Sequence, residues 1–509
     1  MSDEADSLMR IFDAIAKVNK EAYRDVFMIS NSVLNKNPFN NNLFKRYSRK
    51  EAIGKYPFCA KVYKLLLYYI KSTLYFGMYL IRFFEFVVSG FKFDLSSGGK
   101  ELVLIDVPFL LEDIAKSSAF RDRYLPGLED ILKKRGRQYA YLPLFYSQQN
   151  HKRPLELLRA LRILKRFKIP LITEYQMFSL SDIFKLIFFI LTYPFHVIRC
   201  ADKIQDDTEE GKAVKYELMD TLDQATFYNY SRLLLGRRIA RMRYAGIKVI
   251  SWYENRPTDK NLYKGLRDGS HSAHIRIYGA QLFLYSKKTP CFVPHEDELD
   301  FGVLPDKILA NGPYYIQNGT RLNHVVGPSL RYAGIFAMDV NQTDRTNILI
   351  LLPYFIKDAE KILKTLASAA MSRRKFFIKA HPATPLSRFK GLLPASAMIV
   401  RDDIFKLFRT TKILIGAASG TMIEAASVGI PVIAIKSHDG LDINNPMPEY
   451  GRGIIWDYAL DAVSLNEQIK AFEEKLATRA VIIRDVAAKY KDMFFSRPTE
   501  SAIVDAFEL

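Results

Sequence analysis

The stretch from Lys375 to Ile435 decides the fold. It begins with Lys375-Phe-Phe-Ile-Lys-Ala-His-Pro382 and ends with Lys412-Ile-Leu-Ile-Gly-Ala-Ala-Ser-Gly-Thr-Met-Ile-Glu-Ala-Ala-Ser-Val-Gly-Ile-Pro-Val-Ile-Ala-Ile435. Three short apolar runs within it are separated by segments long enough for a helix: Phe376–Ile378, Ile413–Ile415 and Pro431–Ile435. This alternation is typical of βα units in a parallel sheet. Such sheets bind ligands at the carboxyl ends of their strands.

The polar motif Ser419-Gly420-Thr421 follows one of these predicted strands and opens the next helix. A helix start offers free backbone N–H groups and a positive dipole end, which together suit a phosphate. Gly420 permits a close approach of the backbone to a ligand, and the hydroxyls of Ser419 and Thr421 add donors. An alternative is that Thr421 and Glu424 form a capping box, because they have the Thr-x-x-Glu spacing.

A second motif, His381-Pro382, follows the other strand. His381 can donate a hydrogen bond to a phosphate, and Lys379 lies two residues before it to supply charge. The alternative is a purely structural turn, because Pro382 restricts His381 to an extended backbone. The two motifs occur in the order expected of two strand ends that hold one phosphate-bearing ligand.

Together the motifs resemble the nucleotide-binding domain of GT-B glycosyltransferases over roughly residues 340–460. The resemblance is strongest to the bacterial group that uses CMP-activated sialic acid or Kdo. It implies that His381 and Ser419 contact the donor phosphate, and that Glu424 holds the donor ribose. It also implies a nucleotide-sugar substrate in place of a bound cofactor.

The composition narrows the class of protein. The chain has 509 residues, of which 49% are hydrophobic, and a formal net charge of +19. This length allows two or three domains with their own cores. The positive charge predicts an acidic partner, but zinc-ligand spacing, RNA-recognition signatures and long basic blocks are absent, which argues against nucleic acid. Three scattered cysteines and a polar, acidic N-terminus favour a cytoplasmic protein without a signal peptide.

The predicted fold class is α/β, with two Rossmann-like domains in the GT-B arrangement and a helical, membrane-associating N-terminal extension. The predicted segments are the extension at residues 1–100, an acceptor domain at 101–335, a nucleotide-sugar domain at 336–485 and a returning C-terminal helix at 486–509.

A further motif lies in the predicted acceptor domain. A strand ends in Glu254-Asn-Arg-Pro257, and a later strand ends in Gly279-Ala-Gln281. This combination resembles a group of bacterial surface-carbohydrate biosynthesis proteins, although Leu282 stands where that group often has His. Glu254 is the candidate base for an acceptor hydroxyl. Alternatively, Glu254 caps the next helix or pairs with Lys260 or Arg267.

Residues 61–90 form the segment closest to a membrane element. Charges interrupt it too often for a spanning helix. On a helical wheel Lys64, Lys71 and Arg82 fall in one narrow stripe, and the rest of the circumference is apolar. We therefore expect an interfacial helix with this basic stripe toward anionic headgroups. The alternative is a core helix whose three cations reach water.

These observations favour a glycosyltransferase at the inner face of the cytoplasmic membrane, with a lipid-linked or glycan acceptor. A CMP-sugar is the first donor expected and a UDP-sugar the second. A UDP-sugar 2-epimerase, a CDP-polyol phosphotransferase and a non-catalytic assembly scaffold stay open. No metal is expected, because Asp402-Asp403 is the start of a predicted helix rather than an Asp-x-Asp motif.

Overall fold

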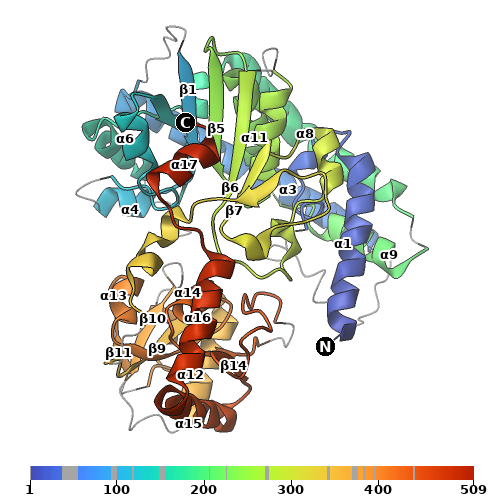
Figure 1. The fold of residues 1–509 in the computed structure, drawn as a ribbon. Helices are drawn as coiled ribbons and strands as arrows, with labels where there is room; N and C mark the ends of the chain where they lie inside the picture. Colours follow the sequence, from blue (N-terminus) through green and yellow to red (C-terminus); the bar gives the residue numbers. More distant parts are fainter. Residues whose placement is uncertain are drawn as a thin grey trace.

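The computed structural model describes most of the chain (Figure 1). The described residues are 2–36, 56–92, 100–116, 120–147, 155–205, 207–224, 226–269, 274–340, 344–369, 376–381, 384, 386–394, 397–438 and 442–509. Pro382, one of the predicted donor-site residues, lies outside them.

Two parallel sheets of six strands each form the centres of two α/β domains (Figure 1). The strand order is β3-β1-β5-β6-β7-β8 in the N-terminal domain and β11-β10-β9-β12-β13-β14 in the C-terminal domain. The N-terminal strands are β1 Glu101–Asp106, β3 Gln138–Tyr141, β5 Gly246–Trp252, β6 Ile275–Gln281, β7 Lys307–Ala310 and β8 His324–Val326. The C-terminal strands are β9 Asn347–Leu352, β10 Phe376–Ala380, β11 Ala397–Ile399, β12 Thr411–Gly416, β13 Val432–Ile435 and β14 Trp456–Ala459. The predicted fold class, two Rossmann-like domains in the GT-B arrangement, is confirmed.

The central strands are nearly continuous apolar runs because helices cover both faces of each sheet. In β9 every residue from Ile348 to Leu352 is buried, and in β12 every residue from Ile413 to Gly416 is buried. The short run at 170–173 contributes only a single bridge, between Leu171 and Tyr141. Pro170 and the start of the next helix at Glu174 leave it too short to extend β3.

Helices surround the two sheets, and most of the long ones belong to the N-terminal half. Those of the N-terminal half are α1 Ser2–Ala22, α3 Phe58–Ser89, α4 Leu111–Lys116, α5 Leu128–Lys134, α6 Glu156–Arg166, α7 Glu174–Met177, α8 Leu180–Lys203, α9 Glu209–Asp220, α10 Phe227–Ile239 and α11 Pro257–Arg267. Those of the C-terminal half are α12 Ile356–Ser368, α13 Ile404–Phe408, α14 Thr421–Ser427, α15 Ala462–Thr478, α16 Ala480–Phe494 and α17 Glu500–Phe507. A small parallel pair, β2 Pro108–Leu110 and β4 Leu144–Tyr146, follows β1 and β3.

The last two helices lead the chain back to the N-terminal domain (Figure 1). At the end of α16 the Phe494 carbonyl accepts a hydrogen bond from Asn311 Nδ2 at 2.7 Å. In α17 Glu500 pairs with Lys134 of α5 at 2.7 Å, and just after this helix Glu508 accepts from the Tyr278 hydroxyl of β6 at 2.9 Å. The C-terminus therefore fastens one domain to the other.

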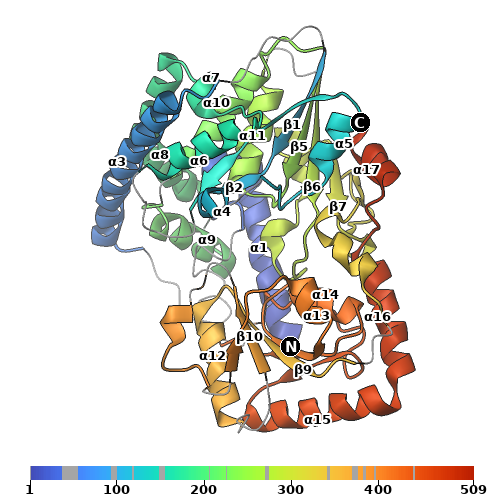
Figure 2. The same cartoon turned by 90° about the vertical axis from the view of Figure 1, so that its left-hand side faces the viewer.

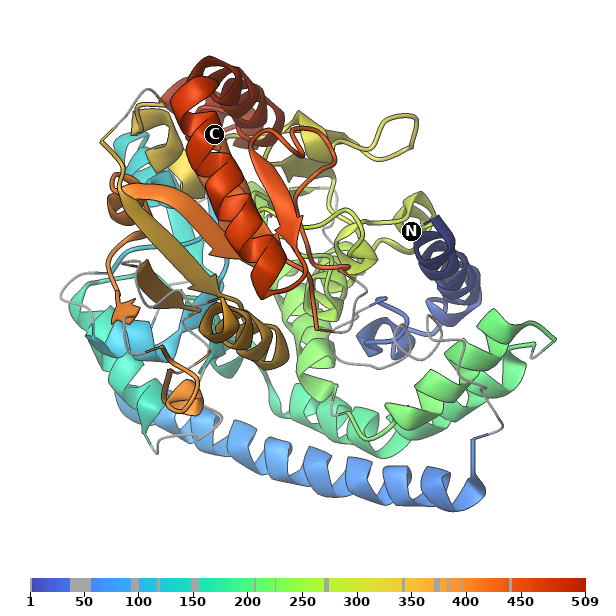
Figure 3. The same cartoon turned by 90° about the horizontal axis from the view of Figure 1, so that it is seen from below.

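Helix α3 runs along one edge of the molecule, beside α6 and α8 (Figures 2 and 3). Lys64 and Lys71 point inward from it, since Lys64 Nζ lies 3.0 Å from Asp223 and Lys71 also pairs with Asp223. Burial raises the pKa of Glu174, and the Arg82 cation nearby opposes that rise. The expectation that these three cations face headgroups is therefore wrong for Lys64 and Lys71, because acidic groups of the protein hold them.

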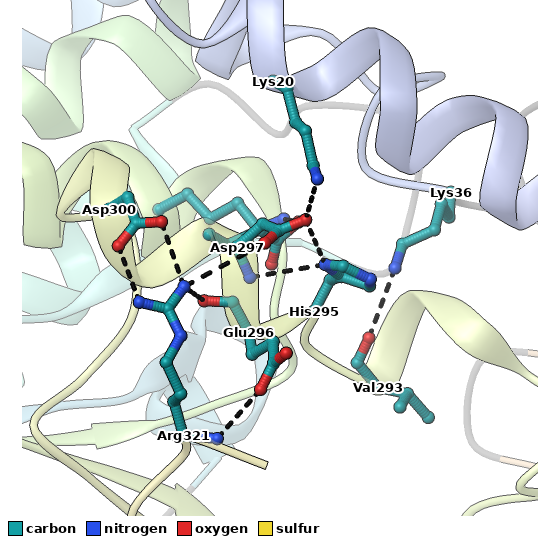
Figure 4. Close-up of polar contacts among 10 residues, drawn as sticks. Lys20, Lys36, Val293, His295, Glu296, Asp297, Asp300 and Arg321 are labelled. Atoms are coloured by element: carbon teal, nitrogen blue, oxygen red, sulfur yellow. Dashed lines mark hydrogen bonds and ion pairs between the residues drawn. The ribbon is translucent and has the colours of Figure 1, made fainter.

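The N-terminal segment is tied to a loop region of the first domain (Figure 4). Lys20 Nζ lies 2.8 Å from Asp297, and Lys36 Nζ donates to the Val293 carbonyl at 3.4 Å. Deeper in the fold Lys260 and Glu298 form a fully buried ion pair at 2.7 Å. Helix α1 belongs to the core of the N-terminal domain, because its side chains Ile11, Phe12 and Ile15 are buried in the same hydrophobic cluster as strand β1.

Candidate functional site

One cavity of about 910 Å³ lies between the two domains, at the carboxyl ends of β1, β5, β9, β10 and β12. This is the place where open parallel sheets hold ligands. It brings together Glu254 from the first domain with Lys379, His381, Ser419, Gly420, Thr421 and Glu424 from the second. The described site residues expected in the two domains therefore share one cavity.

His381 stands directly after β10 and is exposed to the cavity. Its backbone N–H donates to the Leu352 carbonyl at 3.0 Å, which fixes it to the end of β9. The Tyr354 ring meets its imidazole edge-on, with centroids 5.5 Å apart. Loss of hydration and the Arg331 cation both lower the pKa of His381. Both effects favour the neutral imidazole, which carries one ring N–H.

Lys379 lies in β10, two residues before His381. Its Nζ donates to the Asp402 carbonyl at 2.7 Å, and partial burial lowers its pKa although Asp402 and Asp403 oppose this. The ammonium group is thus anchored at the rim of the cavity by the chain that leads into α13. It contributes positive charge to the site from a fixed position.

The loop between β12 and α14 carries the Ser-Gly-Thr motif. Ala418 adopts a left-handed backbone with φ 47°, which turns the chain sharply before Ser419. The Thr421 N–H donates to Ser419 Oγ at 3.3 Å. Because α14 has only seven residues, its dipole is small, and donors must come mainly from these hydroxyls.

Gly420 is required by contact with the other domain. A Cβ at this position would lie 2.8 Å from Leu284 Cβ and 3.2 Å from the Leu284 carbonyl oxygen. The close approach expected of this glycine is therefore made to Leu284 of the first domain. The motif consequently serves a second purpose, since it forms part of the interdomain contact beside the cavity.

Glu424 is buried under the same loop. The capping-box alternative is not realised, because α14 has Gly420 at its N-cap and no side-chain cap. The Thr421 hydroxyl instead bonds the Glu424 carboxylate, and burial raises the pKa of this carboxyl to about 7 although Arg331 and Thr421 counteract the rise. At neutral pH Glu424 can therefore either accept or donate a hydrogen bond.

Glu254 follows β5 on the opposite wall. Its Oε1 accepts from the Trp252 indole N–H at 2.8 Å, and its Oε2 pairs with Arg256. The helix cap is provided by Asp259, which accepts from the Arg256 N–H at 3.0 Å. Both oxygens of Glu254 are thus occupied, and its partners are neither of the two basic residues considered from the sequence.

The sequence did not reveal Arg331. This residue begins the connection between the domains, in the 3-10 segment Leu330–Ala337, and its guanidinium lies over the Trp252 ring at 5.9 Å. Its charge acts on both Glu424 and His381. Arg331 belongs to no sequence motif, and a single arginine near a predicted domain boundary looks like a solvated charge.

Asp122 is a second residue found only in the structure. Its Oδ1 accepts from the N–H groups of Tyr124 at 2.8 Å and Leu125 at 3.1 Å, and burial raises its pKa to about 6. Its Oδ2 is buried without a hydrogen-bond partner among the described residues. Asp122 lines the first-domain side of the cavity and is the alternative to Glu254 as a base.

The described residues contain no group of three or more His, Cys, Asp or Glu side chains placed to hold a metal ion. Asp403 caps α13 by accepting from the Phe405 N–H at 2.9 Å, and Asp402 pairs with Lys406. Both acids of the Asp-Asp pair therefore have local structural partners.

No family model and no curated protein matches the chain. Among solved structures it is similar to MurG of Acinetobacter baumannii, with a TM-score of 0.42 and 10% identity over 80% of this chain and 99% of that one. It is also similar to the UDP-GlcNAc 2-epimerase of Neisseria meningitidis bound to UDP-GlcNAc, with a TM-score of 0.41 and 13% identity over 80% and 99%. A third is the wall teichoic acid polymerase TagF, with a TM-score of 0.40 and 11% identity over 89% and 97%. Likenesses this distant carry no argument about activity, which must come from the site.

Proposed function

We propose that the chain is a glycosyltransferase that moves a sugar from a nucleotide-sugar to an acceptor in cell-surface glycan assembly. The observation that carries the proposal is the interdomain cavity, which is lined by His381, Ser419 and Thr421 of the second domain and by the carboxylates Glu254 and Asp122 of the first. One wall offers hydrogen-bond donors for a phosphate, and the other offers carboxylates for a hydroxyl.

The donor would bind the second domain. His381 and the hydroxyls of Ser419 and Thr421 would hold the phosphate, with Lys379 and Arg331 supplying positive charge. Glu424, buried beside them, would accept from the ribose. Donors fixed in this way stabilise the charge that develops on a departing nucleotide. A CMP-sugar such as Kdo or a sialic-acid-like sugar is favoured, with a UDP-sugar next, and no metal is required.

The acceptor would bind the first domain. The first-domain side of the cavity contributes the apolar and aromatic side chains Phe109, Ile114, Phe120, Ile163 and Phe167, beside the charged Asp113, Arg121 and Arg123. A free polysaccharide offers few groups that such a wall can bury, whereas a lipid-linked acceptor does. The apolar wall therefore supports the lipid-linked class over a soluble glycan.

The first experiment is a thermal-shift panel of CMP, CDP and UDP, since a ligand that binds the folded state raises the midpoint. It is followed by turnover measurements on His381→Ala and Ser419→Ala. Each variant should lose at least ~100-fold in turnover, the scale of a lost phosphate or oxyanion donor. His295→Ala is the control, because His295 is half-exposed and pairs with Asp297 outside the cavity.

The alternatives predict different outcomes. An epimerase would convert a UDP-sugar without any acceptor, and a polyol phosphotransferase would use a CDP-polyol, transfer the polyol phosphate and release CMP. A scaffold would bind a nucleotide without turnover. Near-normal activity of both alanine variants would contradict the donor site.

A further inference from the structure

The exposed hydrophobic side chains of this protein are concentrated on two helices. Among the described residues, 27 large hydrophobic side chains are exposed, and 16 of these belong to α3 or α8. On α3 they are Phe58, Val62, Tyr63, Leu66, Ile70, Leu74, Leu80, Ile81, Phe84, Val87 and Val88, and on α8 they are Leu180, Phe184, Phe188, Leu191 and Phe195. Soluble proteins rarely expose so many apolar side chains in one place unless the surface binds something.

The two sets form one surface. The helices lie side by side, and the Tyr69 hydroxyl of α3 donates to the Leu191 carbonyl of α8 at 2.9 Å (Figure 2). At 1.5 Å per residue the 32 residues of α3 give this surface a length of about 48 Å. We define the α3–α8 face as these 16 side chains.

The charges around the face favour one kind of occupant. In α3 the single acidic residue is Glu85, which is buried and accepts from the Leu158 N–H at 3.0 Å. In α8 Asp182 is buried, and Asp202 stands at the far end. Exposed Lys and Arg side chains lie on the same helices or just beyond their ends instead: Lys92 follows α3, and Lys185, Arg199 and Lys203 lie in α8. An apolar surface with a basic rim and almost no exposed acid complements an anionic bilayer.

Helix α8 has the length and composition of a membrane span, but its packing argues against crossing. Phe189 stacks on Tyr230 of α10 with centroids 4.5 Å apart, and the Tyr193 hydroxyl accepts from Asn31 Nδ2 at 3.0 Å. Asp182 pairs with Arg238. Crossing a bilayer would break these contacts, whereas lying in the interface keeps all of them.

We propose that the α3–α8 face docks the protein on the surface of an anionic lipid bilayer, with the apolar side chains inserted and the basic rim at the headgroups. This differs from binding through the stripe of Lys64 and Lys71, which face Asp223. Binding should therefore be mainly apolar. It should persist on neutral vesicles and at high salt, and it should be stronger on anionic vesicles at low salt.

The test is flotation with vesicles of phosphatidylcholine alone and with phosphatidylglycerol added. The variant is a quadruple one, Leu66→Gln, Ile70→Gln, Phe84→Gln and Phe188→Gln, at positions that are each at least 57% exposed. It should fold with an unchanged circular dichroism spectrum, and its partition should fall by at least ~100-fold because four apolar side chains no longer insert. The control is Leu460→Gln, Val463→Gln, Val481→Gln and Ile482→Gln, which changes four exposed apolar residues of the other domain.

Three outcomes would overturn the proposal. The wild type could stay unbound on both kinds of vesicle, or the folded quadruple variant could float as well as the wild type. In the third outcome the wild type does not bind vesicles, light scattering shows that it is a dimer, and the quadruple variant is a monomer. That result would assign the face to a second copy of the chain.

Discussion

The guanidinium of Arg331 lies 5.9 Å over the ring of Trp252, whose indole N–H in turn holds Glu254 at 2.8 Å. The connection between the domains is thereby fixed to the end of strand β5. Arg331 also influences Glu424 and His381 on the opposite wall. One side chain thus links the charges of both domains at the cavity.

Replacement of Arg331 by Ala should lower kcat/KM for the donor about 100-fold, because a fixed cation near the phosphate is removed. Arg331→Lys should lose less, since it keeps the charge but not the planar group that lies over the indole. Steady-state kinetics with varied donor will measure both. Equal and full activity in the two variants would exclude Arg331 from the donor site.

The base for the acceptor hydroxyl can be identified by comparing Glu254→Gln with Asp122→Asn. Glu254 has both oxygens engaged, whereas Asp122 has a buried unpaired oxygen and a pKa raised to about 6. We expect Asp122→Asn to cause the larger loss, of about 100-fold in kcat, with the acidic limb of the pH–rate profile removed. The opposite order would restore Glu254, the residue expected from the sequence.

The fold could be predicted from the sequence because βα alternation leaves long buried apolar runs such as β9 and β12. The donor motifs were also visible, since His381 and Ser419 directly follow such runs. Arg331 and Asp122 were not, because their importance comes from the way two distant segments meet. The side of α3 that faces solvent was predicted wrongly for a similar reason. A helical wheel shows the basic stripe of Lys64 and Lys71, but it cannot show that Asp223 of another segment faces this stripe.

The pH dependence of stability should contain a contribution from Glu424. Burial raises the pKa of its carboxyl from 4.5 to about 7, so the folded state binds the proton more tightly than the unfolded state. The contribution of Glu424 to the free energy of unfolding is therefore largest below pH 4.5. It is lost as the pH rises to about 7, by up to about 3 kcal/mol. Urea unfolding of wild type and Glu424→Gln between pH 4.5 and 8 will measure it.

The difference in the free energy of unfolding between wild type and Glu424→Gln isolates the contribution of Glu424. Asp259 has a pKa also raised to about 7 by burial, but it is common to both proteins. The free energy of unfolding of Glu424→Gln should increase relative to that of the wild type as the pH rises from 4.5 to 8. A constant difference across the window would mean that Glu424 ionises in the folded state as it does in the unfolded chain.

Activity should survive chelation by EDTA, since the described residues place His381, Lys379 and Arg331, all neutral donors or cations, where a phosphate would lie. The measurement is turnover with and without EDTA at saturating donor. Loss of turnover with recovery on addition of Mg²⁺ or Mn²⁺ would contradict this expectation.

Reversal of Lys64 and Lys71 to Glu should lower stability rather than release the protein from membranes. Asp223 lies between the two lysines with its side chain only 12% exposed, so the double variant places two negative charges against a third. The expected cost is about 2 kcal/mol, less than for a fully buried pair because Lys71 is 44% exposed. Urea unfolding measures this cost, and adding Asp223→Lys should recover most of it. The folded double variant should still float with neutral vesicles, because the α3–α8 face points the other way. Its release from neutral vesicles with unchanged stability would instead place these lysines at the lipid.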